Sequence, residues 1–160
     1  MLAEPQAQHA WLQKLVGDWT YESECPIGPG GAAMKAQGKE TVRPLGGLWI
    51  VAEGNGEMPG GGPATTLLTI GYDPAKGRFT GTWVGSMMTH LWVYEGELDA
   101  SGRVLTLSCD GPSMKGDGST AKYQDIVEIV SDDHRIFTGR VQGDDGQWAT
   151  MMTAHHRRKK

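Results

Sequence analysis

The residue types best suited to chemistry in this sequence gather around one histidine. His90 lies in the segment TWVGSMMTHLWVYEG, residues 82–96, among tryptophan, tyrosine and methionine. Further along, the segment KYQDIVEIV places Asp125 on an otherwise apolar face of a predicted strand. A carboxylate beside the imidazole would raise the pKa of His90 and fix its tautomer, which suits ligand anchoring or general-base chemistry. The sequence therefore suggests a His90–Asp125 pair.

Both residues also have a structural interpretation. A lone histidine on an apolar strand is commonly a core residue that hydrogen-bonds to the backbone or to a hydroxyl. Asp125 could equally lie at a rim and bind only water. The pair is thus one of several arrangements that the pattern permits.

Other chemical motifs are absent from the sequence. The glycine runs GPGG and PGGGP lack the lysine and helix start of a phosphate-binding loop, and Ser86 and Ser108 have no nucleophile motif around them. Cys25 and Cys109 have no metal-type spacing and are expected to be reduced structural thiols. No metal site is therefore predicted, and the only catalytic candidates are His90 and Asp125.

The segment from Thr82 to Gly96 is expected to be a strand with two largely apolar faces. An apolar face can line a barrel interior, and a second one can be covered by a helix, a loop or another subunit. We expect the face that carries His90 to be the interior one, because it mixes large rings with a flexible thioether. That face consists of Thr82, Val84, Ser86, Met88, His90, Trp92 and Tyr94.

The elements that must position these residues are predicted to be one short helix and many strands. Apolar residues at helical spacing predict a helix over about residues 5–16, between Pro5 and Gly17. After it, turn signals such as PIGPGG, PGGGP, DPAKG and GDDG recur, and the apolar period becomes two. About ten strands follow, with predicted starts near Trp19, Met34, Gly47, Thr65, Arg78, Ser86, Arg103, Ala121, Arg135 and Gln147.

Ten strands without a covering helix predict an all-β fold, a single antiparallel up-and-down β-barrel. Closure removes the two exposed edges that an open sheet would have, and leaves room for a small ligand. We expect one domain over residues 1–160, with the barrel over about 18–157 and a solvated basic tail at 157–160. A two-sheet sandwich, the alternative, would fill the interior with side chains.

Composition excludes two kinds of partner. The net charge is −4 and the isoelectric point is near 5.7, so no strong positive field favours nucleic acid. No segment approaches the roughly 20 apolar residues of a membrane span, and the first residues do not resemble a signal peptide. A cytoplasmic protein is expected.

Several segments resemble a known family. LVGDWTYES is similar to the opening of lipocalin-like (calycin) proteins, whose tryptophan packs across the closed end of the barrel. With RPLGGLWIVAEGNGEM and KYQDIVEIVSDDHRIFT, the chain from about His9 to Arg157 resembles a bacterial domain-of-unknown-function family, number fifteen seventy-nine. The resemblance implies a barrel closed by Trp19, and we expect Arg157 to stack on that indole. It implies no activity.

One segment departs from this family. The final MMTAHHRRKK carries His155 and His156 where the family usually has a β-branched or aromatic residue. In the related nitrobindin-like barrels a late-strand histidine binds haem, so haem binding through His90, His155 or His156 is an alternative. Adjacent strand residues point to opposite faces, so one ion could not easily take both His155 and His156.

The predicted function is the binding of a small apolar or amphipathic molecule in the barrel. An enzyme of isomerase or hydrolase type that uses His90 with Asp125 or a tyrosine is the alternative. An outward-facing apolar patch of Met87, Leu91 and Val93 suggests a homodimer. The predicted ligand-binding residues are Tyr21, Phe79, Trp83, Met88, His90, Trp92, Tyr94, Tyr123 and Asp125. Trp83 lies on the opposite face from His90 unless Gly85 marks a bulge or turn that resets the alternation.

Overall fold

Apolar and polar residues alternate along most of the chain, and short turns separate these stretches, so the chain folds into consecutive antiparallel hairpins. The computed structural model describes residues 2–26, 33–58 and 61–160, so the predicted turns PIGPGG and PGGGP lie partly outside the described residues. The strands are β1 (Gly17–Cys25), β2 (Met34–Leu45), β3 (Trp49–Glu57), β4 (Pro63–Asp73), β5 (Arg78–Gly85), β6 (Trp92–Leu98), β7 (Val104–Pro112), β8 (Thr120–Ser131), β9 (His134–Gln142) and β10 (Trp148–Arg158).

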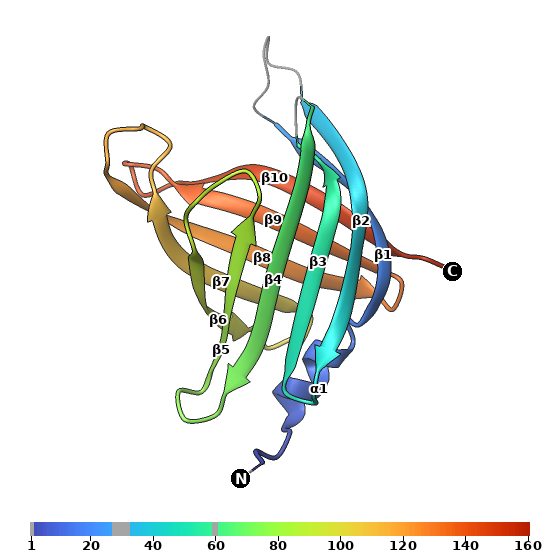
Figure 1. The fold of residues 1–160 in the computed structure, drawn as a ribbon. Coiled ribbons are helices and arrows are strands. Elements are labelled where there is room, and N and C mark those ends of the chain that lie inside the picture. The colour runs from blue at the N-terminus through green and yellow to red at the C-terminus, as the bar shows by residue number, and fades with distance from the viewer. Residues whose placement is uncertain (1, 27–32, 59–60) are drawn as a thin grey trace.

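The ten strands form one closed antiparallel barrel in which each strand pairs with its neighbours in the sequence (Figure 1). The first and last strands complete the ring, with Trp19 opposite Arg158 and Tyr21 opposite His156. The all-β, up-and-down barrel with a short N-terminal helix is therefore confirmed. None of the helices in the described ranges is long and apolar enough to cross a membrane.

The helix α1 (Ala7–Gln13) covers one end of the barrel and is shorter than predicted. The His9 ring explains its start, because Nδ1 accepts a hydrogen bond from the Gln6 amide at 2.8 Å while Nε2 lies 3.0 Å from the carbonyl oxygen of Tyr72. The indole of Trp11 donates to the carbonyl oxygen of Gly102 at 2.7 Å. We call this end of the barrel the closed end.

Large side chains fill the closed end. Trp19 is 2% exposed, and its indole donates to the carbonyl oxygen of Leu15 at 2.9 Å. Around it and α1, the most deeply buried apolar residues are Leu12, Ile50, Ile70, Phe79, Leu105, Leu107 and Val127. This end of the barrel has the dense packing of an ordinary core.

Two guanidinium groups lie over the Trp19 ring, and neither belongs to the predicted residue. The Cζ atoms of Arg158 and Arg135 lie 4.3 and 4.7 Å from the ring centroid. The expected partner, Arg157, was wrong, because it points outward from β10 and is exposed. Arg158 also donates to the carbonyl oxygen of Val16 at 2.7 Å, so a solvated tail cannot begin before Lys159.

The predicted strand over residues 82–96 is two strands. β5 ends at Gly85, a connection runs from Ser86 to Leu91, and β6 begins at Trp92. The break resets the alternation, so Trp83 of β5 and Trp92 of β6 pair with each other and both pack against the core. The predicted interior face was therefore right for β6 but wrong for β5, where Thr82 and Val84 belong to the outer face.

Candidate functional site

The end of the barrel opposite α1, which we call the open end, is lined differently. Several of its inward-facing positions are glycine, and aromatic rings lie directly against them. An added Cβ at Gly111 would collide with the ring of Trp92, and one at Gly38 or Gly56 would collide with the hydroxyl of Tyr21. The rings therefore lie along the wall, and Tyr21, Trp83 and Trp92 are each only partly buried.

Five of the predicted residues come together at this end: Trp83, Trp92, Tyr94, Tyr123 and Asp125. We call them the open-end cluster. Trp83 and Trp92 are cross-strand partners, and the Trp92 and Tyr123 rings meet edge to face with centroids 4.9 Å apart. The Tyr123 hydroxyl donates to the carbonyl oxygen of Pro112 at 2.5 Å, which fixes its ring.

A hydrogen bond inside the barrel joins Tyr94 to Asp125. The Tyr94 side chain is 1% exposed, and its hydroxyl donates to Oδ2 of the carboxylate. The predicted partner of Asp125, His90, was therefore wrong. Alternation explains the contact, because Tyr94 on β6 and Asp125 on β8 both face inward on either side of β7.

Burial changes the acidity of this pair. Desolvation raises the pKa of Asp125 to about 6, although the hydrogen bond from Tyr94 opposes the shift. Burial and the neighbouring carboxylate raise the pKa of Tyr94, so the phenol keeps its proton. The same two causes raise the pKa of the Cys109 thiol to about 12. Asp125 is thus the one member of this group that titrates near neutral pH.

The second carboxylate oxygen of Asp125 is free to accept a hydrogen bond. Within the described residues Oδ1 has no hydrogen-bond partner, yet it is not among the enclosed unpartnered atoms, so part of its surface stays accessible. It faces Gly139 and Met152, where an added Cβ on Gly139 would lie 3.3 Å from Oδ1 and 3.4 Å from Cγ of Met152. Asp125 is therefore an inward residue that is only partly enclosed, with Met152 packed beside it.

His90 and Met88 belong to the connection between β5 and β6. The His90 ring packs edge to face on Trp92, with centroids 4.6 Å apart, and its Nε2 is buried without a partner among the described residues. Met88 is 43% exposed, and its sulfur accepts a hydrogen bond from the Trp92 indole at 3.1 Å. The two residues thus hold Trp92 from the loop side.

Two of the predicted ligand-binding residues lie outside the open-end cluster. Phe79 is 2% exposed and packs against Trp11 and Tyr72 in the closed end. Tyr21 lies on β1 beside the ring of His156, with centroids 5.2 Å apart. Neither residue touches the open-end cluster.

A buried ionic group on the interior wall was not predicted. The Arg135 guanidinium pairs with Glu40, and Nε2 of His156 lies 3.8 Å from the same carboxylate. Burial and the Arg135 charge hold the pKa of His156 well below its usual range, so this imidazole is neutral. Arg135 alternates with Phe137 along β9, and that alternation was the available sequence signal for an inward arginine.

His155 lies on the outer face, as expected from its position beside His156. Its Nδ1 is 2.9 Å from Nε2 of His134, and the two exposed rings stack. Within the described residues no group of three metal-ligating side chains is present.

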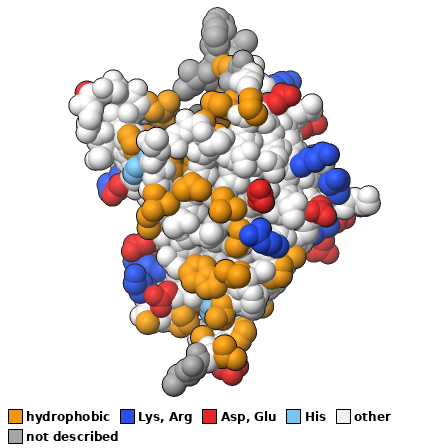
Figure 2. All heavy atoms as spheres, viewed as in Figure 1, with side chains coloured by type: hydrophobic (Ala, Val, Ile, Leu, Met, Phe, Trp, Pro, Cys, Tyr) orange, Lys and Arg blue, Asp and Glu red, His pale blue; other side chains and the backbone are white. Residues whose placement is uncertain are grey.

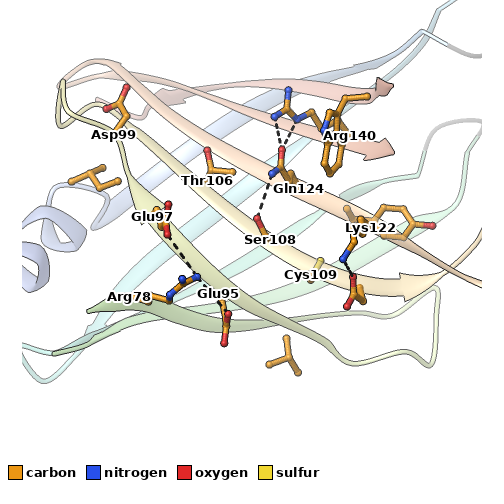
Figure 3. Close-up of a pocket in the computed structure, with 15 residues that line it drawn as sticks. Arg78, Glu95, Glu97, Asp99, Thr106, Ser108, Cys109, Lys122, Gln124 and Arg140 are labelled. Carbon is orange, nitrogen blue, oxygen red and sulfur yellow. Dashed lines mark hydrogen bonds and ion pairs between the residues drawn. The ribbon is translucent and has the colours of Figure 1, made fainter. Parts of the chain in front are cut away.

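A groove of about 930 Å³ lies on the outer face of β6 to β9, separate from the predicted interior site (Figure 3). Two ion pairs line it: Arg78 lies 3.7 Å from Glu95 and Lys122 lies 3.5 Å from Asp110. Of the predicted site residues, Tyr123 lines this groove.

The groove adjoins the weakest seam of the barrel. The ladder between β6 and β7 holds only from Glu95–Ser108 to Leu98–Leu105, so Trp92, Val93 and Tyr94 have no partner on β7. The Trp92 ring covers this gap from inside by lying on Gly111.

Comparison with known proteins identifies the family of this chain. Residues 4–158 match the model of a family described as "Protein of unknown function (DUF1579)". No curated protein matches the sequence.

Three solved structures share the barrel at low sequence identity. Rv2717c from M. tuberculosis is 12% identical with a TM-score of 0.68, covering 98% of this chain and 100% of its own. The S-type phycobiliprotein lyase from Guillardia theta is 11% identical with a TM-score of 0.58, covering 97% and 94%. The barrel EF1p2_mFAP2b, bound to DFHBI, is 14% identical with a TM-score of 0.52, covering 96% and 100%. These likenesses establish the fold.

Proposed function

This chain belongs to the DUF1579 family, and we propose that it binds a small apolar or amphipathic molecule in the open end of its barrel. The observation that carries the proposal is Asp125, a carboxylate deep in the barrel whose Oδ1 is unpartnered and accessible. A filled core would enclose such a group or satisfy it, because an unpaired buried polar atom costs free energy.

The surroundings of Asp125 support a binding site. Accessible aromatic surface with one or two polar groups is the usual lining of a small-molecule pocket. Trp83 and Trp92 supply the aromatic surface, while Tyr94 fixes the carboxylate. A barrel of similar fold is bound to DFHBI, which supports small-molecule binding by this architecture.

The alternatives fit the geometry less well. A His90–Asp125 catalytic pair is not favoured because Asp125 bonds to Tyr94. Haem ligation is not favoured because His155 lies outside the barrel, Nε2 of His156 faces Glu40 and Nε2 of His90 is enclosed. A Soret band on haem addition would contradict this interpretation.

A space-filling substitution tests the proposal. Gly139→Leu places a side chain beside Asp125, and Thr138→Leu, one residue away on the outer face of β9, is the matched control. We expect the neutral probe N-phenyl-1-naphthylamine to bind the wild type and Thr138→Leu, with increased emission, and Gly139→Leu to bind at least about tenfold more weakly. Native mass spectrometry of the purified protein would identify any molecule that copurifies.

The stability of the same variant is a second readout. Filling an open interior is tolerated, whereas adding a leucine to a packed core costs about 1–3 kcal/mol. Absence of probe binding together with a large loss of stability in Gly139→Leu would show a filled barrel and defeat the proposal.

We also propose that the protein forms a homodimer through an outer face. Figure 2 shows hydrophobic side chains on the face formed by β4 to β6. The exposed members there are Leu67, Val84, Met88, Leu91 and Val93, with Leu91 and Val93 more than half exposed. Met87, which was expected among them, is half-buried, and its sulfur would meet a Cβ added at Gly85. A contiguous apolar surface of this kind is seldom left bare.

Light scattering of a double substitution tests the dimer. Leu91→Ser with Val93→Ser is expected to give a monomer at concentrations where the wild type is a dimer. Met114→Ser, which changes an exposed methionine outside this face, should leave the mass unchanged. A monomeric wild type at micromolar concentration would contradict the dimer.

A further inference from the structure

Asp125 stands out electrostatically from the rest of the interior. The other charged inward residues in the described ranges, Glu40, Arg135 and Arg158, lie together and compensate one another or pack on Trp19. Asp125 has no such partner: burial dominates its environment, and its one polar contact is a neutral phenol. The open end therefore holds a carboxylate without a countercharge from the protein.

The neighbours of this carboxylate favour a positive guest over a negative one. Tyr94 occupies Oδ2, and Oδ1 can only accept a hydrogen bond when the group is ionised. Trp83 and Trp92 are only partly buried, and the face of an indole attracts cations. A bound anion would instead meet the carboxylate without any basic side chain to offset the repulsion.

We propose that the molecule bound in the open end is an organic amine, and that its protonated nitrogen pairs with Oδ1 of Asp125 while its apolar body lies among the aromatic rings. This inference rests on the proposed binding function and names its ligand class. An ammonium supplies the countercharge and the donor that the site lacks, and a charge-assisted hydrogen bond is stronger than a neutral one.

The same geometry predicts how binding depends on pH. The titratable groups that face Asp125 are Tyr94 on β6 and Cys109 on β7, and burial raises the pKa of both, so they stay protonated. Asp125 itself becomes protonated below about pH 6. The preference for an amine should therefore weaken between pH 7.5 and 5.

Three probes of one shape test the inference by isothermal titration calorimetry at pH 7.5: 2-naphthylmethylamine, 2-naphthalenemethanol and 2-naphthoate. We expect the amine to bind about tenfold or more tightly than the alcohol, since a charge-assisted hydrogen bond is stronger than a neutral one. Naphthoate should bind most weakly. Asp125→Asn should bring the amine and the alcohol to within about threefold of each other.

Two further measurements keep the test decisive. Thr138→Leu, on the outer face of β9, leaves the carboxylate in place, so it should retain the amine preference. The wild-type pH series needs no variant at all. Alcohol or naphthoate binding as tightly as the amine would overturn the ligand class while the binding function stands. Failure of all three probes and of N-phenyl-1-naphthylamine would instead overturn the binding function itself.

Discussion

The two ends of this barrel pack an inward-facing tryptophan in different ways. At the closed end Trp19 lies under α1, hydrogen-bonded through its indole and held between two guanidinium groups. At the open end Trp92 lies flat on Gly111, and its indole reaches only the sulfur of Met88 on a loop. The first arrangement excludes solvent, whereas the second leaves aromatic surface facing the interior.

The difference shows how one barrel can be both stable and open. Dense packing at one end supplies the burial that stabilises the fold. The other end can then use glycine on its inner wall, which removes side chains from the space that a ligand would occupy. Stability and binding are thus expected to depend on different residues.

The largest effect should come from removing the closed-end indole. Trp19→Ala is expected to lower the free energy of unfolding by about 3–5 kcal/mol, because it leaves a cavity in a packed core. Trp83→Ala at the open end should cost at least about 1 kcal/mol less, since part of its ring is already accessible. Urea denaturation of both variants measures the contrast, and equal losses would erase the distinction between the two ends.

The next effect is the pH dependence of the free energy of unfolding that Asp125 causes. The pKa of Asp125 is about 6 in the folded protein and near 3.8 when exposed, so the folded state binds this proton more tightly. Its contribution to stability is full below about pH 4 and is lost as the pH rises through 6, by up to about 3 kcal/mol.

A comparison with Asp125→Asn isolates that contribution. The unfolding free energy of the wild type relative to the variant should fall between pH 4 and 7 in urea titrations. The neutral His156 contributes equally to both proteins and cancels in the difference. A difference that stays constant across this range would show that Asp125 is not desolvated.

The smallest effect on stability should come from a substitution at Gly111, which lies beneath the Trp92 ring. Gly111→Ala puts a methyl group where the indole lies, so the ring must move away from the gap between β6 and β7. We expect a cost of about 1–3 kcal/mol and a shift in tryptophan emission. At Gly139 the nearest heavy atom to an added Cβ is 3.3 Å away, so Gly139→Ala should change both quantities less.

The sequence predicted the architecture well because turn chemistry and a period of two repeat through most of the chain. Glycine, proline and aspartate mark the turns, and ten strands without a second helix leave few ways to hide their edges. The opposite directions of His155 and His156 followed from the same alternation, whereas Trp19 at the closed end was implied by the resemblance to lipocalin-like proteins.

The site was harder to predict for two reasons. It depends on which face of a strand each residue occupies, and its contacts join residues that lie far apart in the sequence. The connection Ser86–Leu91 contains Thr, Met and Leu, which read as strand residues, so the reset of the alternation at Gly85 was foreseen only as the condition for placing Trp83 inside. Asp125 was identified as inward, but its choice of Tyr94 over His90 depends on the break before β6. Likewise, the arginine of β10 that stacks on Trp19 is Arg158 and not the predicted Arg157, which is a difference of one residue along the strand.

The pairing of β1 with β10 implies an order of events during synthesis on the ribosome. Until β10 has been made, β1 has only one of its two neighbours, and the tryptophan at its start lacks both arginines, which come from β9 and β10. Such distant pairings are slow to form because loop closure costs entropy before contacts repay it. The stacking of Trp19 between the guanidinium groups should therefore be among the last steps of folding, and its fluorescence would report completion of the ring rather than the earlier hairpins.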